Sequence, residues 1–259
     1  MSEERMASDI HDSVLTPNRY FAYIAALAKR FEESPCSTVE KLETFPKYVP
    51  RGTLARFLAK LRIFELALPV HGSVFECGVH LGGGLFTWAQ LSAILEPANH
   101  QRRIVGFDTF AGFPEGGVSS QDLGRDPSPE CVQGGMAASS YDELLRCIEC
   151  YDLVRYMSHL PKIQLVQGDF METLPAYLAH NPHTIVSLLY LDFDLHDPTE
   201  LALSMVLPLM PKGAVVAFDQ LGHPSWPGET QAVIDQLGIH ELALRGFPFG
   251  TSICYAVLE

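Results

Sequence analysis

Two patterns of hydrophobic positions alternate along most of the chain: short apolar runs of strand length, and longer stretches with helical spacing. The strands predicted from the apolar runs are Val74–Cys77, Ile104–Phe107, Ile163–Val166, Ile185–Leu191, Ala214–Phe218, His240–Leu244 and Ser252–Leu258. Helical spacing between them covers Thr173–Ala179, Pro198–Met210 and Glu229–Leu237. This alternation predicts an α/β fold with a mostly parallel seven-stranded sheet and helices on both faces. Residues 245–251 are too few for a helical crossover, so the last strand should be antiparallel.

Two further stretches with helical spacing, Asn18–Phe31 and Thr53–Leu68, come before the first predicted strand. We therefore expect a helical appendage or lid over residues 1–70 and one catalytic domain over residues 71–259. Residues 112–140 interrupt the alternation with several glycines, prolines and acids. Such an irregular insertion is either a functional lid that helps to line an acceptor pocket or an ordinary surface loop.

Composition and charge narrow the possible partners. The chain has 259 residues and a formal net charge of −13, which argues against a nucleic-acid ligand because such proteins need a basic face. It has no apolar span long enough for a membrane helix and no signal-peptide pattern, and its cysteines suggest no disulfide framework. We expect a cytoplasmic protein that acts on a small molecule without membrane contact, and its apolar appendage is compatible with a homodimer.

The richest local signal is the glycine-rich segment at residues 75–84, FECGVHLGGG. A strand, a glycine turn and a helix in this order place backbone N–H groups at the end of a strand, where α/β sheets bind nucleotide-like ligands. The spacing matches neither a phosphate-binding P-loop nor the dinucleotide fingerprint. A turn needed only for tight strand–helix packing is the alternative. The candidate cofactor residues are Glu76, Gly78, His80, Gly82 and Gly83.

Acids at the ends of the other strands extend this candidate site. Asp108 stands where nucleotide-binding folds place the carboxylate that accepts ribose hydroxyls. Asp169 offers a carboxylate for an adenine amino group, and Phe170 offers an aromatic face for its ring. Acids from several parallel strands should meet at one edge of the sheet, where they repel unless a ligand or hydrogen-bond donors neutralise them.

The segment Asp192–His196 and Asp219 carry the candidate chemistry. Asp192 could contact the cofactor near its reactive end, and with Asp219 it makes a plausible pair of ligands for a hard cation such as Mg²⁺. Asp194 or His196 is then a candidate general base. The alternative is that these residues begin a helix ahead of Pro198, and Asp197 fits the position of the helix cap best.

Together these motifs resemble the macrocin O-methyltransferase family within the class I S-adenosylmethionine (SAM)-dependent methyltransferases, over roughly residues 45–258. The matching pieces are residues 75–84, 106–115, 168–170 with 173–175, 191–194, and 211–213 leading to 218–219. The resemblance implies Mg²⁺-assisted methylation of a sugar hydroxyl, with Asp192 and Asp219 as metal ligands and Asp194 as the base. It also implies that Thr109, in the second piece, belongs to the cofactor site.

One residue departs from the family pattern, which commonly has two adjacent acids after the fifth strand. Here Asp219 is followed by Gln220, whose amide oxygen is a weaker third metal ligand. A metal-independent small-molecule O- or N-methyltransferase with His196 or His223 as base therefore stays open. So do a non-catalytic SAM-binding protein and, less favoured by the glycine spacing, a nicotinamide-dependent oxidoreductase.

Overall fold

The computed structural model describes residues 17–124 and 127–259, and the chain divides into two units. One unit comprises the residues up to Ala59 together with Phe247–Ser252, and the other comprises Lys60–Gly246 and Ile253–Glu259. Residues 1–16 of the expected appendage and residues 125–126 of the insertion lie outside the described residues.

The smaller unit is helical. It contains α1 (Pro17–Glu32), α2 (Thr38–Glu43), the short 3₁₀ helix η2 (Phe45–Lys47) and the start of α3 (Arg51–Ala67). Ser37 begins α2 with a capping box, because its hydroxyl accepts the Glu40 N–H and the Glu40 carboxylate accepts the Ser37 N–H. The two helices predicted in this region are confirmed, and their ends fall within two residues of the expected ones.

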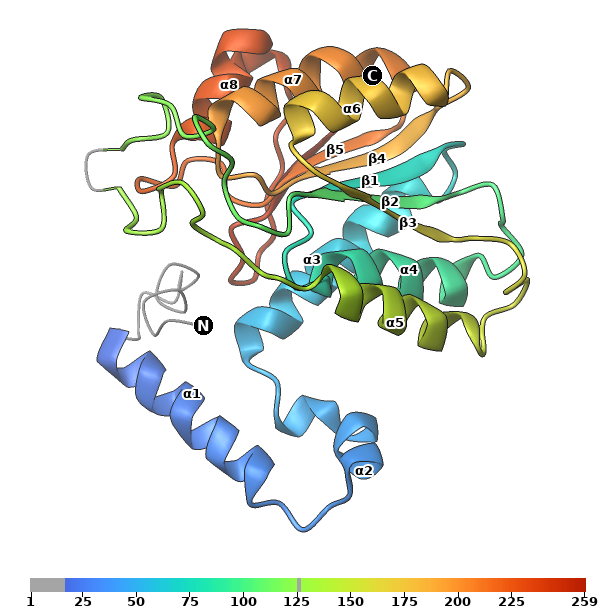
Figure 1. Ribbon diagram of the computed structural model, residues 1–259, viewed down its shortest axis with the longest axis vertical. Coiled ribbons are helices and arrows are strands. Elements are labelled where there is room, and N and C mark those ends of the chain that lie inside the picture. Colours follow the sequence, from blue (N-terminus) through green and yellow to red (C-terminus); the bar gives the residue numbers. More distant parts are fainter. Residues whose placement is uncertain (1–16, 125–126) are drawn as a thin grey trace. The chain divides into compact units, whose positions relative to one another are not determined.

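The larger unit is built on a six-stranded sheet in the order β3-β2-β1-β4-β5-β6 (Figure 1). Its strands are β1 (Ser73–Cys77), β2 (Ile104–Asp108), β3 (Ile163–Gln167), β4 (Val186–Leu191), β5 (Val215–Phe218) and β6 (Cys254–Val257). The first five strands are parallel, whereas β6 runs antiparallel to β5. The predicted parallel sheet with an antiparallel last strand is thus confirmed.

The prediction of a seventh strand at His240–Leu244 is wrong. The chain there forms the 3₁₀ helix η4 (Ile239–Glu241) and a turn, and only Arg245 makes a bridge, with Tyr255. Leu242 and Leu244 still pack against the main core. The apolar alternation thus correctly indicates that Leu242 and Leu244 are partly buried, but these residues form no β-strand hydrogen bonds with the sheet.

Helices cover both faces of the sheet (Figure 1). On one face α4 (Gly83–Leu95) lies beside α5 (Tyr141–Asp152), where the Tyr151 hydroxyl donates to the Ala89 carbonyl at 2.8 Å. On the other face lie α6 (Phe170–His180), α7 (His196–Val206) followed by the 3₁₀ helix η3 (Leu207–Leu209), and α8 (Gly228–Gln236). Every residue of β4 and β5 is buried, as expected for parallel strands covered on both sides. Within the described residues, no helix is long and apolar enough to cross a membrane.

The start of α7 differs from the expectation that Asp197 caps it. The helix begins at His196 after Leu195, and no local side chain caps it. Asp197 lies inside the first turn instead. The His196 N–H is accepted by the Asp122 carboxylate at 2.6 Å, so a residue far away in the sequence takes the place of the local cap.

Arg102 ties the end of α3 to the edge of the sheet. Its guanidinium donates to the main-chain carbonyls of Ala67, Leu68 and Val70 at 3.0–3.3 Å and pairs with Glu96 at 2.7 Å. The side chain is only 2% exposed, so these carbonyls have little access to water.

We predict that Arg102→Leu lowers the free energy of unfolding by about 3–5 kcal/mol, because it leaves a buried carboxylate and several carbonyls without their donor. Urea denaturation measures this loss. The matched control is Arg62→Leu, since Arg62 makes an exposed ion pair with Glu65 whose loss should cost below about 1 kcal/mol. Equal losses for the two variants would contradict the assignment of Arg102 as a buried tie.

Candidate functional site

The carboxyl ends of the five parallel strands are joined in register at one edge of the sheet. Four main-chain hydrogen bonds of 2.9–3.0 Å connect neighbouring strand ends: Gly168 to Asp108, Gly78 to Phe107, Asp192 to Cys77, and Asp219 to Leu191. The residues following β1, β4 and β5 are thereby adjacent, and Asp108 and Gly168 continue the row. The expectation that the strand-end acids share one rim of the sheet is confirmed.

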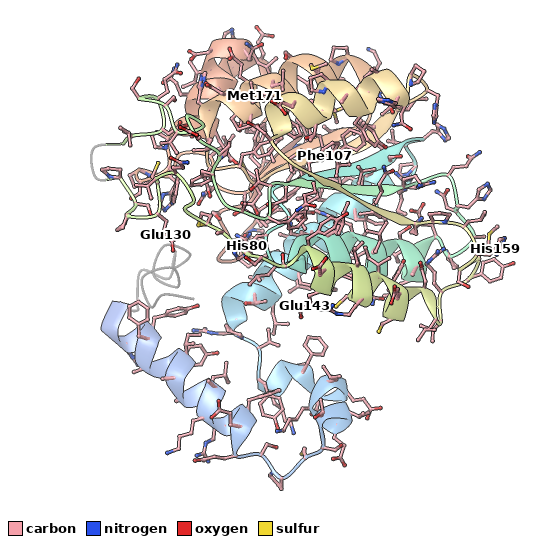
Figure 2. All side chains as sticks on the ribbon, in the orientation of Figure 1. His80, Phe107, Glu130, Glu143, His159 and Met171 are labelled. Atoms are coloured by element: carbon pink, nitrogen blue, oxygen red, sulfur yellow. The ribbon has the colours of Figure 1, made fainter. Side chains whose placement is uncertain are left out.

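Two positions of the glycine turn between β1 and α4, Gly78 and Gly82, require glycine, whereas Gly83 borders open space. Gly78 has φ +90°, and a Cβ there would overlap the main-chain oxygen of Asp192. Gly82 precedes α4 with φ +83°, whereas a Cβ on Gly83 would meet nothing within 4 Å. Figure 2 shows His80 at the rim of the sheet, and its carbonyl accepts a hydrogen bond from the Ser140 hydroxyl. The turn thus combines tight packing with open space at the start of a helix.

Asp108 holds this turn in place. One of its oxygens accepts the N–H groups of Val79 and His80 at 2.8 and 2.7 Å, and the other accepts the Phe110 N–H at 2.6 Å. Thr109 shapes the next turn, since its hydroxyl donates to the Gly112 carbonyl at 2.6 Å. Both residues lie beside the glycine turn, as a cofactor site requires, and both also have a clear role in local structure.

Asp169 and Phe170 have structural roles that the sequence analysis did not foresee. Asp169 caps α6, because its carboxylate accepts the Met171 N–H at 2.9 Å. Phe170 is 5% exposed, and its ring packs against those of Phe107 and Phe193 at centroid distances of 5.3 and 4.5 Å. The structure thus places Phe170 in the core, and the adenine contacts of these two residues stay a prediction.

Glu76 lies beneath the glycine turn and is 2% exposed. It pairs with Lys60 at 3.7 Å and accepts a hydrogen bond from the Trp88 indole. The Lys60 ammonium also lies 3.3 Å from the centre of the Tyr190 ring, and the Tyr190 hydroxyl donates to Asp219. A buried polar chain therefore runs from the glycine turn to the end of β5, and Glu76 supports the turn from below.

Asp194 follows β4 by three residues, and Asp219 directly follows the neighbouring strand β5. Asp194 is 5% exposed and has φ +64°, a left-handed conformation that is unusual outside glycine. One of its carboxylate oxygens accepts a hydrogen bond from the Gln220 side-chain amide. Gln220 thus acts toward Asp194 as a donor, which the second acid of the family pattern could not do. Asp192 lies directly before this loop and against Gly78.

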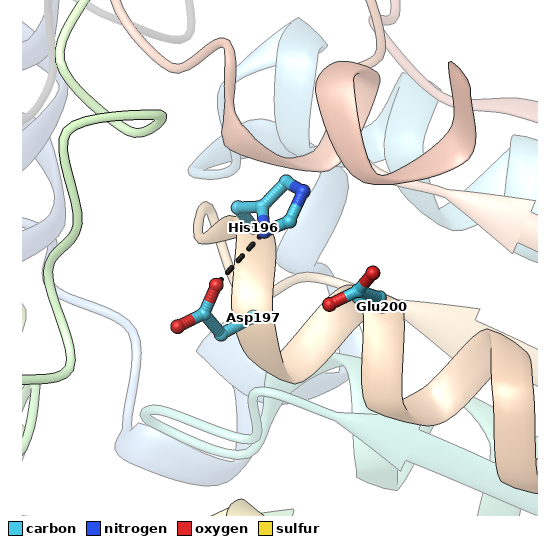
Figure 3. A group of neighbouring side chains, drawn as sticks. All are labelled: His196, Asp197 and Glu200. Atoms are coloured by element: carbon cyan, nitrogen blue, oxygen red, sulfur yellow. Dashed lines mark hydrogen bonds and ion pairs between the residues drawn. The ribbon is translucent and has the colours of Figure 1, made fainter. Parts of the chain in front are cut away.

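The oxygen donors here fit an open magnesium site rather than a closed one. Mg²⁺ is typically held by one or two carboxylates, with water and substrate oxygens completing its coordination. Asp192 and Asp219 supply such carboxylates from neighbouring strand ends. Asp192 and Asp219 are not part of the cluster of potential metal ligands found among the described residues. That cluster consists of His196, Asp197 and Glu200, whose ligand atoms lie within 4.8 Å of one another (Figure 3).

His196 is not well placed to act as the base. Its two ring nitrogens contact Asp197 at 2.8 Å and Asp235 at 3.2 Å (Figure 3 shows the first contact). Burial lowers the pKa of His196, but the hydrogen bonds to these two carboxylates outweigh burial and leave the pKa raised. A ring that holds its proton more firmly and has both nitrogens engaged is a poor proton acceptor. The geometry therefore favours Asp194.

Two acids that the sequence analysis did not single out also belong to this region. Asp122 in the insertion and Glu229 on α8 are both 0% exposed. Both accept main-chain N–H groups from the segment Phe193–His196. No local motif marks their contacts with this segment, because the residues that they hold there lie at least 35 positions away in the sequence.

Comparison with known proteins identifies the family. The model of the macrocin O-methyltransferase family (TylF) matches residues 63–238, which is more than half of the chain. The chain belongs to this family. The predicted resemblance is therefore confirmed, and so, at the level of the family, is the enzyme class of a SAM-dependent O-methyltransferase.

Similar proteins of known structure and name agree with this assignment. The chain is 34% identical to the calicheamicin methyltransferase CalS11, with a TM-score of 0.86 over 97% of this chain and 96% of that one. The O-methyltransferase NovP shares the fold, with 21% identity and a TM-score of 0.59 over 78% of this chain and 79% of that one. A Streptomyces olivaceus 4'-O-methyltransferase, which acts on a rhamnosylated tetracenomycin C, is 30% identical over 60% of this chain. That match spans 54% of the relative's own length.

We predict that Lys60→Met destabilises the protein by about 3–5 kcal/mol, because it leaves the Glu76 carboxylate buried without its cation. The double variant Lys60→Met/Glu76→Gln removes that charge as well and should regain part of the loss. Chemical denaturation measures both values. A double variant less stable than Lys60→Met alone would contradict a buried ion pair between these residues.

Proposed function

We propose that the protein transfers the SAM methyl group to a hydroxyl of a sugar, carried by a nucleotide or by a natural product. The supporting observation is the buried Asp194 carboxylate, which accepts a hydrogen bond from Gln220, the residue that follows Asp219 at the end of β5. The relatives support the acceptor class. A second CalS11 structure, 33% identical with a TM-score of 0.80 over 96% of this chain and 97% of that one, is described as a TDP-rhamnose 3'-O-methyltransferase. The Streptomyces olivaceus relative is named for a rhamnosyl acceptor.

Cofactor binding and proton acceptance are assigned to different residues at this edge of the sheet. The glycine turn and Asp108 hold SAM, which when bound supplies an electrophilic methyl group. Asp194, whose carboxylate Gln220 orients, accepts the proton of the acceptor hydroxyl. A sugar hydroxyl is a weak nucleophile at neutral pH. The main catalytic contribution of the protein is therefore to remove the hydroxyl proton as the oxygen–methyl bond forms.

Asp192 and Asp219 would hold Mg²⁺, together with the side-chain oxygen of Gln220. The Gln220 amide nitrogen faces Asp194, which leaves its oxygen for a cation. The ion, when bound, would lower the pKa of the acceptor hydroxyl by acting as a Lewis acid. The Tyr190 hydroxyl fixes one oxygen of Asp219, which orients the carboxylate for metal binding.

We predict that the wild type binds SAM but not NAD in calorimetric titration and methylates a nucleotide-linked deoxyhexose such as TDP-rhamnose. Asp194→Asn should lower kcat by about 100-fold or more, because the amide cannot take the proton, while the Kd for SAM stays within about threefold. Mass spectrometry of the sugar product and release of S-adenosylhomocysteine give the two readouts.

Glu200→Gln is the matched control, since it removes a carboxylate of α7 that lies outside the proposed proton path. It should leave kcat within about threefold of the wild type. NAD binding without SAM binding would refute the proposed function. Full activity of Asp194→Asn would refute Asp194 as the base.

The metal assignment makes a separate prediction, tested by calorimetric titration with Mn²⁺ as a probe ion. Asp219→Asn should weaken Mn²⁺ binding by about 10- to 100-fold, because it removes one of two carboxylate ligands. Gln220→Asp restores the second acid of the family pattern and should tighten Mn²⁺ binding by about 10-fold. A wild type that binds no Mn²⁺ and keeps full turnover in EDTA would instead establish the metal-independent mechanism.

A further inference from the structure

The segment Phe193–His196, which carries the proposed base, leaves β4 and has no strand beside it to accept its N–H groups. Asp194 moreover has a left-handed backbone conformation, which is unfavourable for a residue with a side chain. Residues outside the sheet therefore have to accept these N–H groups and hold Asp194 in its unfavourable conformation. Two fully buried carboxylates do so.

Glu229 supports the first half of the segment. One of its carboxylate oxygens accepts the N–H groups of Phe193 and Asp194 at 3.0 and 3.3 Å. Burial raises the pKa of Glu229 well above its usual range, and the neighbouring Asp194 and Asp219 raise it further. These shifts favour the uncharged form of Glu229, which accepts hydrogen bonds through the same oxygen.

Asp122 supports the second half and comes from the insertion at residues 112–140. Its Oδ1 accepts the His196 N–H at 2.6 Å. Its Oδ2 accepts the Ser119 N–H at 2.6 Å and the Ser119 hydroxyl at 2.8 Å, so the same carboxylate holds the insertion's own turn. A carboxylate at the start of α7 is also favoured by the helix dipole.

Gly228 shows that this arrangement is closely fitted. A Cβ at Gly228 would overlap the Asp122 carboxylate, and it would lie 2.6 Å from the His196 nitrogen and 2.9 Å from the Asp194 carbonyl oxygen. Only glycine lets the start of α8 approach both the insertion and the base segment at this point. Two parts of the chain that are distant in sequence, the insertion and the start of α8, therefore converge on the backbone of the segment Phe193–His196.

We propose that Asp122 and Glu229 are positioning residues that fix the backbone of the segment Phe193–His196, and that Asp122 makes the placement of the base Asp194 depend on the seating of the insertion. The role assigned to Asp194 rests on the proposed function. A local cap from Asp197 would have been enough to begin α7 but would have left the insertion uncoupled from the base. The contact through Asp122 joins a loop outside the sheet to the backbone two residues after Asp194.

Steady-state kinetics of four variants test the coupling. Asp122→Ala and Glu229→Met remove the acceptors and should each lower kcat by about 10- to 100-fold, because a base displaced by about 1 Å loses its proton-transfer geometry. The Kd for SAM should stay within about threefold, since neither residue contacts the glycine turn. Glu229→Gln keeps the accepting oxygen and should retain kcat within about threefold of the wild type. Glu115→Gln removes an exposed carboxylate of the same insertion and is the matched control.

Hydrogen–deuterium exchange of the peptide covering residues 190–200 provides a readout that does not depend on activity. Asp122→Ala and Glu229→Met should speed amide exchange there by about 10-fold or more, whereas Glu229→Gln and Glu115→Gln should not. Unchanged exchange in both acceptor-removing variants would overturn the proposal, as would a Glu229→Gln variant as impaired as Glu229→Met. If the wild type methylates no sugar, the proposed function fails, and the exchange data still decide whether the two carboxylates hold the segment.

Discussion

The in-register ending of five parallel strands is the constraint on which the site depends. Hydrogen bonds between strand ends place Asp108, Gly78, Asp192 and Asp219 in neighbouring positions along one edge of the sheet. Because β4 and β5 are buried on both faces, a register shift of one residue would move each of their side chains to the opposite face and disrupt the packing of the core. The packing of the core therefore determines the spacing of the polar groups. The strand-end residues of the site are thus positioned by the sheet itself.

Several negative charges at this edge would repel one another if they were not individually satisfied. Each carboxylate has donors of its own: backbone N–H groups for Asp108, Tyr190 for Asp219, and Gln220 for Asp194. Glu76 has the Lys60 ammonium. Buried carboxylates with hydrogen-bond donors are held in fixed orientations, which suits the proposed roles of Asp194 toward a proton and of Asp219 toward a cation.

The sequence could predict the parts of this structure that depend on local pattern. Buried parallel strands are continuous apolar runs, which locate β1 to β5 to within about one residue. Leu242 and Leu244 show the limit of the pattern, because two apolar residues can be buried from a turn as well as from a strand. Phe170 shows another limit: an aromatic residue beside a binding edge serves the core equally well. The partners of Asp122 and Glu229 could not be predicted, because they are fixed by how the insertion and α8 pack against the sheet.

Gln220 connects the metal question to the geometry of the base. A second carboxylate at this position would add a metal ligand but would face Asp194 with like charge, and it would need the cation to neutralise the pair. The amide of Gln220 is a weaker metal ligand than a carboxylate, but it orients Asp194 by donating a hydrogen bond to its carboxylate. Glu229 accepts the Asp194 N–H beneath the same segment, and its raised pKa favours the uncharged form beside Asp194. The amide at position 220 thus orients the proposed base by direct donation, whereas two adjacent acids would rely on a cation to neutralise the like charges.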